Sequence, residues 1–272
     1  MEKYDVIVIG GGPAGYPSAI RCSQNGKKVL LVEELALGGV CLNRGCIPTK
    51  ALYTISEEVS PSRHKCLEKS VQYQWNKVLN EILNDVIIRL RTGIGMLLKG
   101  YGVDVIKGKA KFVDIKTVEV NGKAYTGDNI VIATGASSFV PDCFKNDKRV
   151  IVSDHIWQFQ QLPESVGIIG GGFIGCEFAS ILNKFGVRVK IYEMMDTLLP
   201  GKDREITELL KKQFEKRGIE VNLNQKLTGC ETIDTEKVFV SVGVMANIPE
   251  FKGIELDKKG IKTDERLRTN ID

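Results

Sequence analysis

The chain has 272 residues, 43% hydrophobic and 26% charged, which is typical of a globular protein with a sizeable core and excludes a disordered, collagen-like or fibrous chain. Its length suits two domains. Lys and Arg number 38 against 34 Asp and Glu, and the two signs are interspersed, so we expect no nucleic-acid partner.

Export and membrane signals are weak in this sequence. An apolar run begins at Val6 without a preceding basic region or cleavage site, so we expect no signal peptide. The longest apolar stretch, residues 166–176, is too short to span a bilayer. Seven cysteines without an export signal favour a reducing cytoplasm, where a disulfide would be catalytic. We therefore expect a cytoplasmic protein with no membrane partner.

The first predicted element is a βαβ unit. An apolar run at residues 6–9 leads into a Gly-Gly-Gly-Pro-Ala-Gly turn at 10–15, and a second apolar run ends on Glu33. A G-x-G-x-x-G turn between a strand and a helix, with a later acid, is the context of a dinucleotide site. Pro17 lies five positions into the expected helix, where an interior proline that removes a hydrogen bond should cost up to about 3 kcal/mol.

Two cysteines follow this unit. Cys41 and Cys46 are separated by four residues, and on a regular helix such positions are about 7.5 Å apart along the axis, farther than the roughly 6.8 Å that a disulfide permits between Cα atoms. A bonded pair therefore requires an irregular backbone, which Gly45 would allow. Three alternatives stay open: a redox pair, two buried free thiols, or half of a metal site, for which His64 and Cys66 are a poor second half.

A long amphipathic helix is predicted next. Apolar residues recur at steps of three and four from Val71 to Ile94, with Asn80 and Asp85 on the polar side. Alternating runs at 103–106, 109–113, 117–120 and 129–132 predict strands, with a hairpin turn at Asn121-Gly122. The pattern lapses at 141–149, which gives a first domain over residues 1–148 and a second over 149–272.

The second domain repeats the first unit. A Gly-Gly-Gly-Phe-Ile-Gly turn at 170–175 follows an apolar run, and Glu193, like Glu33, comes 23 residues after the first glycine of its turn. A carboxylate at this place repels a 2′-phosphate, so the second site should prefer NAD to NADP. A helix at 203–217 ended by Gly218, and strands at 219–223 and 238–242, complete the predicted domain.

Together these segments resemble a known family. The two glycine turns, Ala133-Thr134-Gly135 and the stretch GVCLNRGCIPTK at residues 39–50 are similar to motifs of the FAD-dependent pyridine nucleotide–disulfide oxidoreductases (class I), and most similar to those of the dihydrolipoyl dehydrogenases. The resemblance implies an α/β fold with two Rossmann-like domains, for FAD and NAD, and a small β-meander. It implies electron transfer between a dithiol, free or on a lipoyl domain, and NAD.

The resemblance also implies residue roles. Cys41 would exchange with the substrate disulfide, and Cys46 would be the thiolate against the flavin. Lys50 would lie near the flavin N5 and pair with Glu177, and Phe173 would cover the nicotinamide pocket. The residues expected to bind FAD are Gly10, Gly12, Pro13, Ala14, Gly15, Glu33, Glu34, Gly39, Val40, Lys50, Ala110, Thr134 and Gly135. Those expected to bind NAD are Gly170, Gly171, Gly172, Phe173, Ile174, Gly175, Glu193 and Gly243. No metal is implied.

Departures from the family pattern set a second expectation. The chain stops before the family's second flavin motif, so we expect the interface domain, which forms the family's homodimer and supplies an acid–base histidine, to be absent. His64 and His155 lack that histidine's context. The meander after 219–223 is nearly missing, and 243–247 lacks the family's arginine and proline, so we expect sheet edges left uncovered. The alternative to an active oxidoreductase is an impaired nucleotide-binding paralogue, or a fragment that needs a partner for the missing domain.

Overall fold

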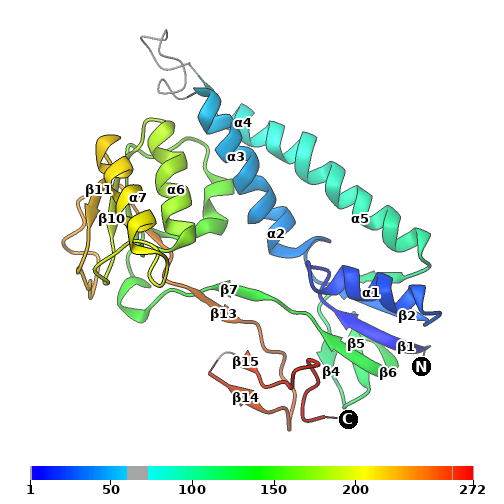
Figure 1. Cartoon of the computed structure of the whole chain (residues 1–272). Helices are drawn as coiled ribbons and strands as arrows, with labels where there is room; N and C mark the ends of the chain where they lie inside the picture. The colour runs from blue at the N-terminus through cyan, green and yellow to red at the C-terminus, as the bar shows by residue number, and fades with distance from the viewer. Residues whose placement is uncertain (1, 60–72, 259, 272) are drawn as a thin grey trace. The chain divides into compact units, whose positions relative to one another are not determined.

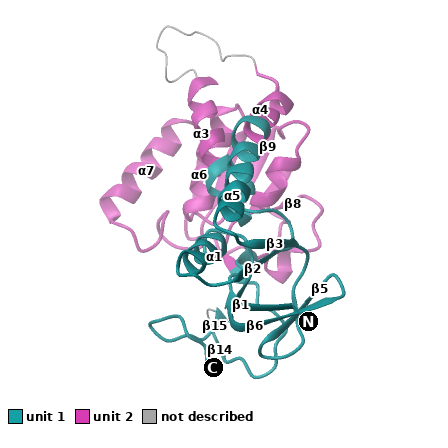
Figure 2. Ribbon diagram, turned by 90° about the vertical axis from the view of Figure 1, so that its right-hand side faces the viewer, with its two compact units in different colours: residues 1–48, 84–137, 245–272 teal, residues 49–83, 138–244 magenta. Residues whose placement is uncertain are grey.

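The computed structural model describes residues 2–59, 73–258 and 260–271 (Figure 1). Val71, His64 and Cys66 lie outside these ranges. The chain forms two compact units: unit 1 comprises Met1–Pro48, Asn84–Ser137 and Met245–Asp272, and unit 2 comprises Thr49–Leu83 and Ser138–Val244 (Figure 2). A single boundary after residue 148 would put Thr49–Leu83 in the first domain and Met245–Asp272 in the second. The structure groups each of these segments with the other unit. The boundary after residue 148 stays a prediction.

Unit 1 is built on a six-stranded sheet ordered β3-β2-β1-β6-β5-β4. The strands are β1 (Glu2–Ile9), β2 (Val29–Glu33), β3 (Asp104–Lys107), β4 (Lys111–Phe112), β5 (Thr117–Val120) and β6 (Lys123–Ile132). The first three and β6 run parallel, whereas β4 and β5 are antiparallel to their neighbours. In β1, Ile7 and Val8 point to opposite faces and are both fully buried, as in a central parallel strand.

The predicted hairpin turn is confirmed. Asn121 and Gly122 both have positive φ, 52° and 78°, the backbone that a two-residue turn between antiparallel strands requires. β6 begins at Lys123, six residues before the predicted strand, because its first residues pair with β5 before the rest pair with β1.

The helix α1 (Gly15–Gln24) corrects the expectation for Pro17. Ala14 is its N-cap, so Pro17 is the third residue of the helix. The first four N–H groups of a helix have no partner within it, so a proline there removes no hydrogen bond. The expected destabilisation was wrong because the helix starts at Gly15, two residues later than a fifth position for Pro17 requires.

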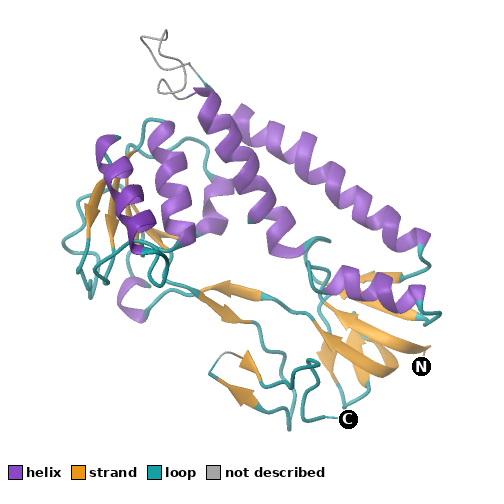
Figure 3. Ribbon diagram, viewed as in Figure 1, coloured by secondary structure: helices purple, strands orange, loops and turns teal. Residues whose placement is uncertain are grey.

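The two helices α2 (Gly39–Asn43) and α3 (Cys46–Val59) follow. The long predicted helix is found as α4 (Trp75–Glu81), the π-helical η2 (Ile82–Ile88) and α5 (Arg89–Gly100) (Figure 3). Across η2 the buried positions step by five, from Ile82 to Ile87, as i→i+5 hydrogen bonding dictates. Leu83 and Leu90, predicted in the apolar stripe, are therefore exposed.

Unit 2 carries a second, wholly parallel sheet ordered β11-β10-β9-β12-β8. Its strands are β8 (Val150–Ile151), β9 (Ser165–Ile169), β10 (Arg188–Tyr192), β11 (Glu220–Asn222) and β12 (Lys237–Val240). The helix α6 (Phe173–Lys184) follows β9, and α7 (Arg204–Lys216) is capped by the Asp203 side chain and ends before Gly218 at a φ of 79°. The repeated βαβ unit is thus confirmed, and with it the α/β fold class.

The segment between β11 and β12 covers one face of the unit 2 sheet, whose edges we expected to be left uncovered. Cys230 and Ile233 are buried against Ile169, Val238 and Val240. The connection is short, as the nearly missing meander implied, and the half-buried Leu227 packs against the same cluster. The outer strands β8 and β11 remain sheet edges.

The remaining elements are short. They are β7 (Ala136–Ser138) paired with β13 (Val244–Ala246), β14 (Leu256–Asp257) paired with β15 (Gly260–Ile261), and the 3-10 helices η3 (Asp142–Phe144) and η4 (Ser153–Gln158). Among the helices of the described ranges, none has the length and apolar content to cross a membrane.

Candidate active site: two glycine turns and a cysteine pair

Gly10, Gly12 and Gly15 of the first glycine turn differ in the space around them. Gly10 has a φ of 104°, and a Cβ there would overlap the carbonyl oxygen of Ala133. A Cβ on Gly15 would overlap the carbonyl oxygen of Gly10, so α1 can start directly against β1. The middle glycine is different, because among the described atoms a Cβ on Gly12 would meet only the Gly39 Cα, at 3.6 Å.

The second turn repeats this arrangement in unit 2. Gly170 has a φ of 103°, and a Cβ on it would lie 2.6 Å from the carbonyl oxygen of Ser241. A Cβ on Gly175 would overlap the Gly170 carbonyl oxygen, whereas of the described atoms none lies within 4 Å of a Cβ on Gly172. In both turns the outer glycines permit close packing and the middle one leaves space, which fits a dinucleotide pyrophosphate approaching the backbone there.

The glutamate that follows each turn accepts a hydrogen bond from the backbone of that turn. Glu33 Oε2 accepts a hydrogen bond from Gly11 N at 2.6 Å, and Glu193 Oε2 accepts one from Gly171 N at 2.6 Å. The other Glu193 oxygen accepts from Met195 N at 2.8 Å, and the residue is 5% exposed. Each carboxylate retains lone pairs that can accept from ribose hydroxyls. Glu34, also predicted at the first site, is exposed.

The cysteine pair lies where the chain breaks from one helix to another. α2 ends at Asn43, Arg44 leaves the helix with a φ of −145°, and α3 starts at Cys46. The irregular backbone that a Cys41–Cys46 bond requires is therefore present. Burial, together with the neighbouring Cys46 sulfur, raises the pKa of Cys41 to about 11. Both thiols are free; Cys46 is exposed and Cys41 half-buried.

The helix α2 is joined to the first glycine turn. Gly38 N donates to the Gly11 carbonyl oxygen at 2.8 Å. Gly39 has a φ of 59°, and a Cβ on it would lie 2.7 Å from the Gly12 Cα. The predicted pyrophosphate turn and the cysteine pair thus form one local structure within unit 1.

Thr134 and Gly135, also predicted at the first site, accept hydrogen bonds from Asn247, a contact that the sequence did not reveal. Asn247 donates from its backbone N to the Gly135 carbonyl oxygen at 2.9 Å and from Nδ2 to the Thr134 carbonyl oxygen at 3.1 Å. Gly135 has a φ of 70°. Ala110 is half-buried against the sheet core, and Pro13, Ala14 and Val40 are exposed.

Residues predicted at the second site are mostly exposed. Phe173 is 64% exposed at the start of α6, with the Lys202 ammonium 5.4 Å from its ring centroid. Ile174, at 40%, and Gly243, with a φ of 129°, are also exposed.

The predicted pairing of Lys50 with Glu177 is not seen. The Lys50 ammonium lies 5.0 Å from the Tyr53 ring centroid, and Glu177 is exposed on α6. Within the described ranges these two side chains form no ion pair, so their pairing stays a prediction for the ligand-bound protein.

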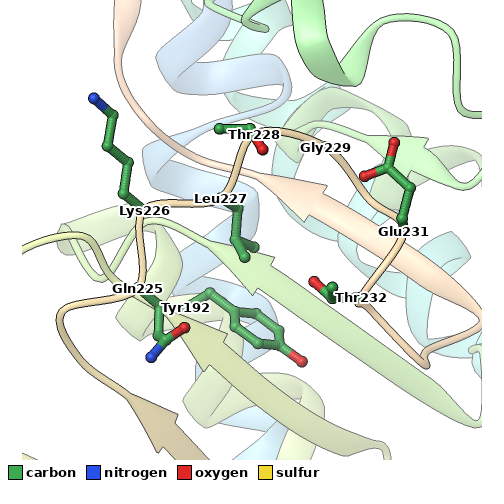
Figure 4. Close-up of a pocket in the computed structure, with 8 residues that line it drawn as sticks. All are labelled: Tyr192, Gln225, Lys226, Leu227, Thr228, Gly229, Glu231 and Thr232. Atoms are coloured by element: carbon green, nitrogen blue, oxygen red, sulfur yellow. The ribbon is translucent and has the colours of Figure 1, made fainter.

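A cavity of about 370 Å³ lies beneath residues 225–232 of unit 2 (Figure 4). Tyr192 contributes its floor, and Lys226 and Glu231 point away from the Tyr192 ring. Gln225 N donates to the carbonyl oxygen of Glu193 at 2.9 Å, so this segment is fixed beside the end of β10. The cavity lining contains none of the predicted cofactor residues.

Sequence reasoning missed two supporting side chains. The Ser241 hydroxyl donates at 3.1 Å to the Ile169 or Gly170 carbonyl oxygen, and thereby fixes the second turn. Arg91 binds the side chain of Asn43 on α2. Neither has a sequence signal, because each acts through a contact between segments far apart in the chain. In the described part of the chain, no group of three or more His, Cys, Asp or Glu could hold a metal ion.

Two α/β units, each with a dinucleotide-type glycine turn after a parallel strand, and a cysteine pair beside the first turn define the class of nucleotide-dependent disulfide oxidoreductases. The family model described as pyridine nucleotide-disulphide oxidoreductase matches residues 4–272. The chain belongs to this family.

Its relatives include dihydrolipoyl dehydrogenases. The enzyme of Acholeplasma laidlawii is 37% identical over 99% of this chain and 88% of its own length, and that of Bacillus subtilis (strain 168) is 36% identical over 98% and 63%. Among solved structures, the HOCl-induced flavoprotein disulfide reductase RclA from Escherichia coli matches with a TM-score of 0.87 and 28% identity, over 99% of this chain and 64% of that one.

Two further facts emerge from these matches. The chain spans less than two thirds of the length of the Bacillus subtilis enzyme and of RclA. The alignment to the Bacillus subtilis enzyme runs over 298 residues, whereas this chain has 272, so that relative carries residues inside the matched region that have no counterpart here.

Proposed function

We propose that this chain is a flavin-dependent disulfide oxidoreductase of the dihydrolipoyl dehydrogenase kind, which passes electrons between a dithiol and NAD. The single observation that carries the proposal is the junction of Gly38 and Gly39 with the first glycine turn, because it fixes a cysteine pair next to a turn with room for a dinucleotide. The wider family membership supports the same chemistry.

The chain's own residues would bind, orient and exchange sulfur bonds. Gly10, Gly12 and Gly15 would hold FAD, and the turn at residues 170–175 would hold NAD; bound FAD would supply the hydride chemistry between thiols and nicotinamide. For a disulfide substrate, the Cys41 thiolate forms a bond to one substrate sulfur and releases the other as a thiol. Cys46 then attacks Cys41, which releases the second substrate thiol and leaves the Cys41–Cys46 disulfide. A pKa of about 11 at Cys41 makes the first step faster as the pH rises.

A second candidate is a nucleotide-binding chain with little turnover of its own, which needs a partner chain. It is favoured by the short connection between β11 and β12 and by the residues that the Bacillus subtilis relative carries in addition. In this case FAD or NAD would bind, but the thiol chemistry would be slow.

The deciding experiment is spectroscopic. The purified chain should bind FAD, and anaerobic addition of NADH or dihydrolipoamide should produce a long-wavelength charge-transfer band. The band should be lost in Cys46→Ser and kept in Cys143→Ser, since Cys143 is an exposed cysteine outside the pair. Flavin binding without the band selects the second candidate. A protein that takes up no FAD contradicts the first candidate, and one that binds neither FAD nor NAD contradicts both.

A further inference from the structure

A clamp between α5 and α2 fixes the helix that carries Cys41. Arg91 on α5 donates from Nε at 3.0 Å and from Nη2 at 2.6 Å to the same atom, Asn43 Oδ1. Within the described residues Arg91 forms no ion pair with a carboxylate. Its two donors are therefore directed at a neutral amide, which is an uncommon partner for a half-buried guanidinium.

Asn43 passes this restraint on to the backbone around Cys41. Its Nδ2 donates to the carbonyl oxygens of Gly39 at 2.8 Å and Leu37 at 3.0 Å, at the start of α2. The amide is thus held on its oxygen side by Arg91 and on its nitrogen side by the chain that enters the helix. All of these residues belong to unit 1.

The helix α2 needs such an anchor. It has five residues, and a helix of that length has no stability of its own. α5 is anchored in turn, because Leu98 is fully buried in the cluster formed with Val8 and Leu31 of the unit 1 sheet. Arg91 therefore links a marginal helix to a rigid one.

We propose that Arg91 is a positioning residue for the redox pair: through Asn43 it holds α2 so that the Cys41 sulfur stays next to Cys46. The inference deepens the proposed function and rests on it. When two thiols are held next to each other, the effective concentration of one at the other is higher than when their helix can move. Loss of the clamp therefore weakens the disulfide relative to the dithiol, without changing either cysteine.

The test is a thiol–disulfide equilibrium that needs neither FAD nor NAD. The full chain is equilibrated with oxidised and reduced glutathione, where two protein thiols become one disulfide as one glutathione disulfide becomes two thiols. The fraction of bonded Cys41–Cys46 is then read by alkylation and mass spectrometry. Arg91→Met, which retains the apolar stem, should lower the equilibrium constant for the disulfide about tenfold, which corresponds to about 30 mV.

Two variants separate the clamp from general effects. Arg89→Met removes a charge from the same helix, an exposed guanidinium that pairs only with Asp85 in the described residues, and should leave the constant unchanged. Arg91→Lys keeps the charge but has no fork of two donors, and should lose most of the effect. Asn43→Ala should reproduce the shift, and combining it with Arg91→Met should add little.

The outcomes are distinct. An unchanged constant in Arg91→Met, an equal shift in Arg89→Met, a wild-type constant in Arg91→Lys, or fully additive effects of the two clamp substitutions each overturn the proposal. If Arg91→Met fails to fold, judged by far-UV circular dichroism, Arg91→Lys and Asn43→Ala alone decide it. Because no flavin is involved, failure of the proposed function through missing FAD binding is seen separately, in the absorbance experiment.

Discussion

Among single residues, Arg149 shows how one side chain stabilises a connection without secondary structure. Its guanidinium donates to the carbonyl oxygens of Ile233 at 2.7 Å and Cys230 at 2.9 Å, and it pairs with Asp147 at 2.7 Å. These bonds fix the segment that covers the unit 2 sheet. The sequence did not indicate this role, because residues 141–149 read as a polar boundary.

Replacing Arg149 should therefore destabilise unit 2. In Arg149→Met we expect a loss of about 3 kcal/mol in the free energy of unfolding, because hydrogen bonds from a charged donor to buried carbonyls are lost together. Both tryptophans, Trp75 and Trp157, belong to unit 2, so urea unfolding followed by tryptophan fluorescence reports on this unit. Lys145→Met, which breaks an exposed pair with Asp142, is the control and should cost less than about 0.5 kcal/mol.

The same pair predicts a pH dependence. Hydrogen bonds from Arg149 lower the pKa of Asp147 to about 2, whereas an unfolded Asp has a pKa near 3.9. The stabilisation by ionised Asp147 is therefore fully present above about pH 4 and is lost as the pH falls toward 2. The stability difference between wild type and Asp147→Asn, measured by urea unfolding, should shrink over this range. A difference that stays constant down to pH 2 would contradict the assignment.

At the scale of elements, the glycine turns give a matched pair of substitutions. A Cβ on Gly175 would overlap the Gly170 carbonyl oxygen, whereas one on Gly172, at a φ of −75°, has no described atom within 4 Å. Gly175→Ala should lower the stability of unit 2, because α6 must move away from β9. Gly172→Ala should leave the urea midpoint unchanged but weaken NAD binding at least tenfold, as measured by calorimetry. If Gly172→Ala bound NAD like wild type, the turn would not be the nucleotide site.

Strands and glycine turns were predictable from the sequence because their signals are local. The alternation of apolar residues and the Asn121-Gly122 turn depend only on neighbouring residues. The π-helical stretch at Ile82–Ile88 was not predictable, because an apolar periodicity of three and four still fits it approximately. The start of α1 was misplaced for a related reason, since the extent of a turn depends on the strand it packs against.

For the whole molecule, the two units should respond to different nucleotides. Hydrogen–deuterium exchange with FAD should protect peptides around residues 10–15 and 134–135 of unit 1, and exchange with NAD should protect peptides around 170–175 of unit 2. At a hundred times its dissociation constant, a ligand stabilises its unit by about 2.7 kcal/mol. NADP should protect unit 2 less than NAD at equal concentration, because Glu193 repels the 2′-phosphate. Equal protection by NADP would contradict this role of Glu193.

The sequence by itself determined the two glycine turns, the acids that follow them and the presence of a cysteine pair, because each is a short motif with fixed spacing. Only the tertiary structure decided how these parts are held. The clamp of Arg91 on Asn43 and the anchoring of the β11–β12 connection by Arg149 both join residues that are distant in the chain. Such contacts follow from the packing of whole elements, and no local pattern records them.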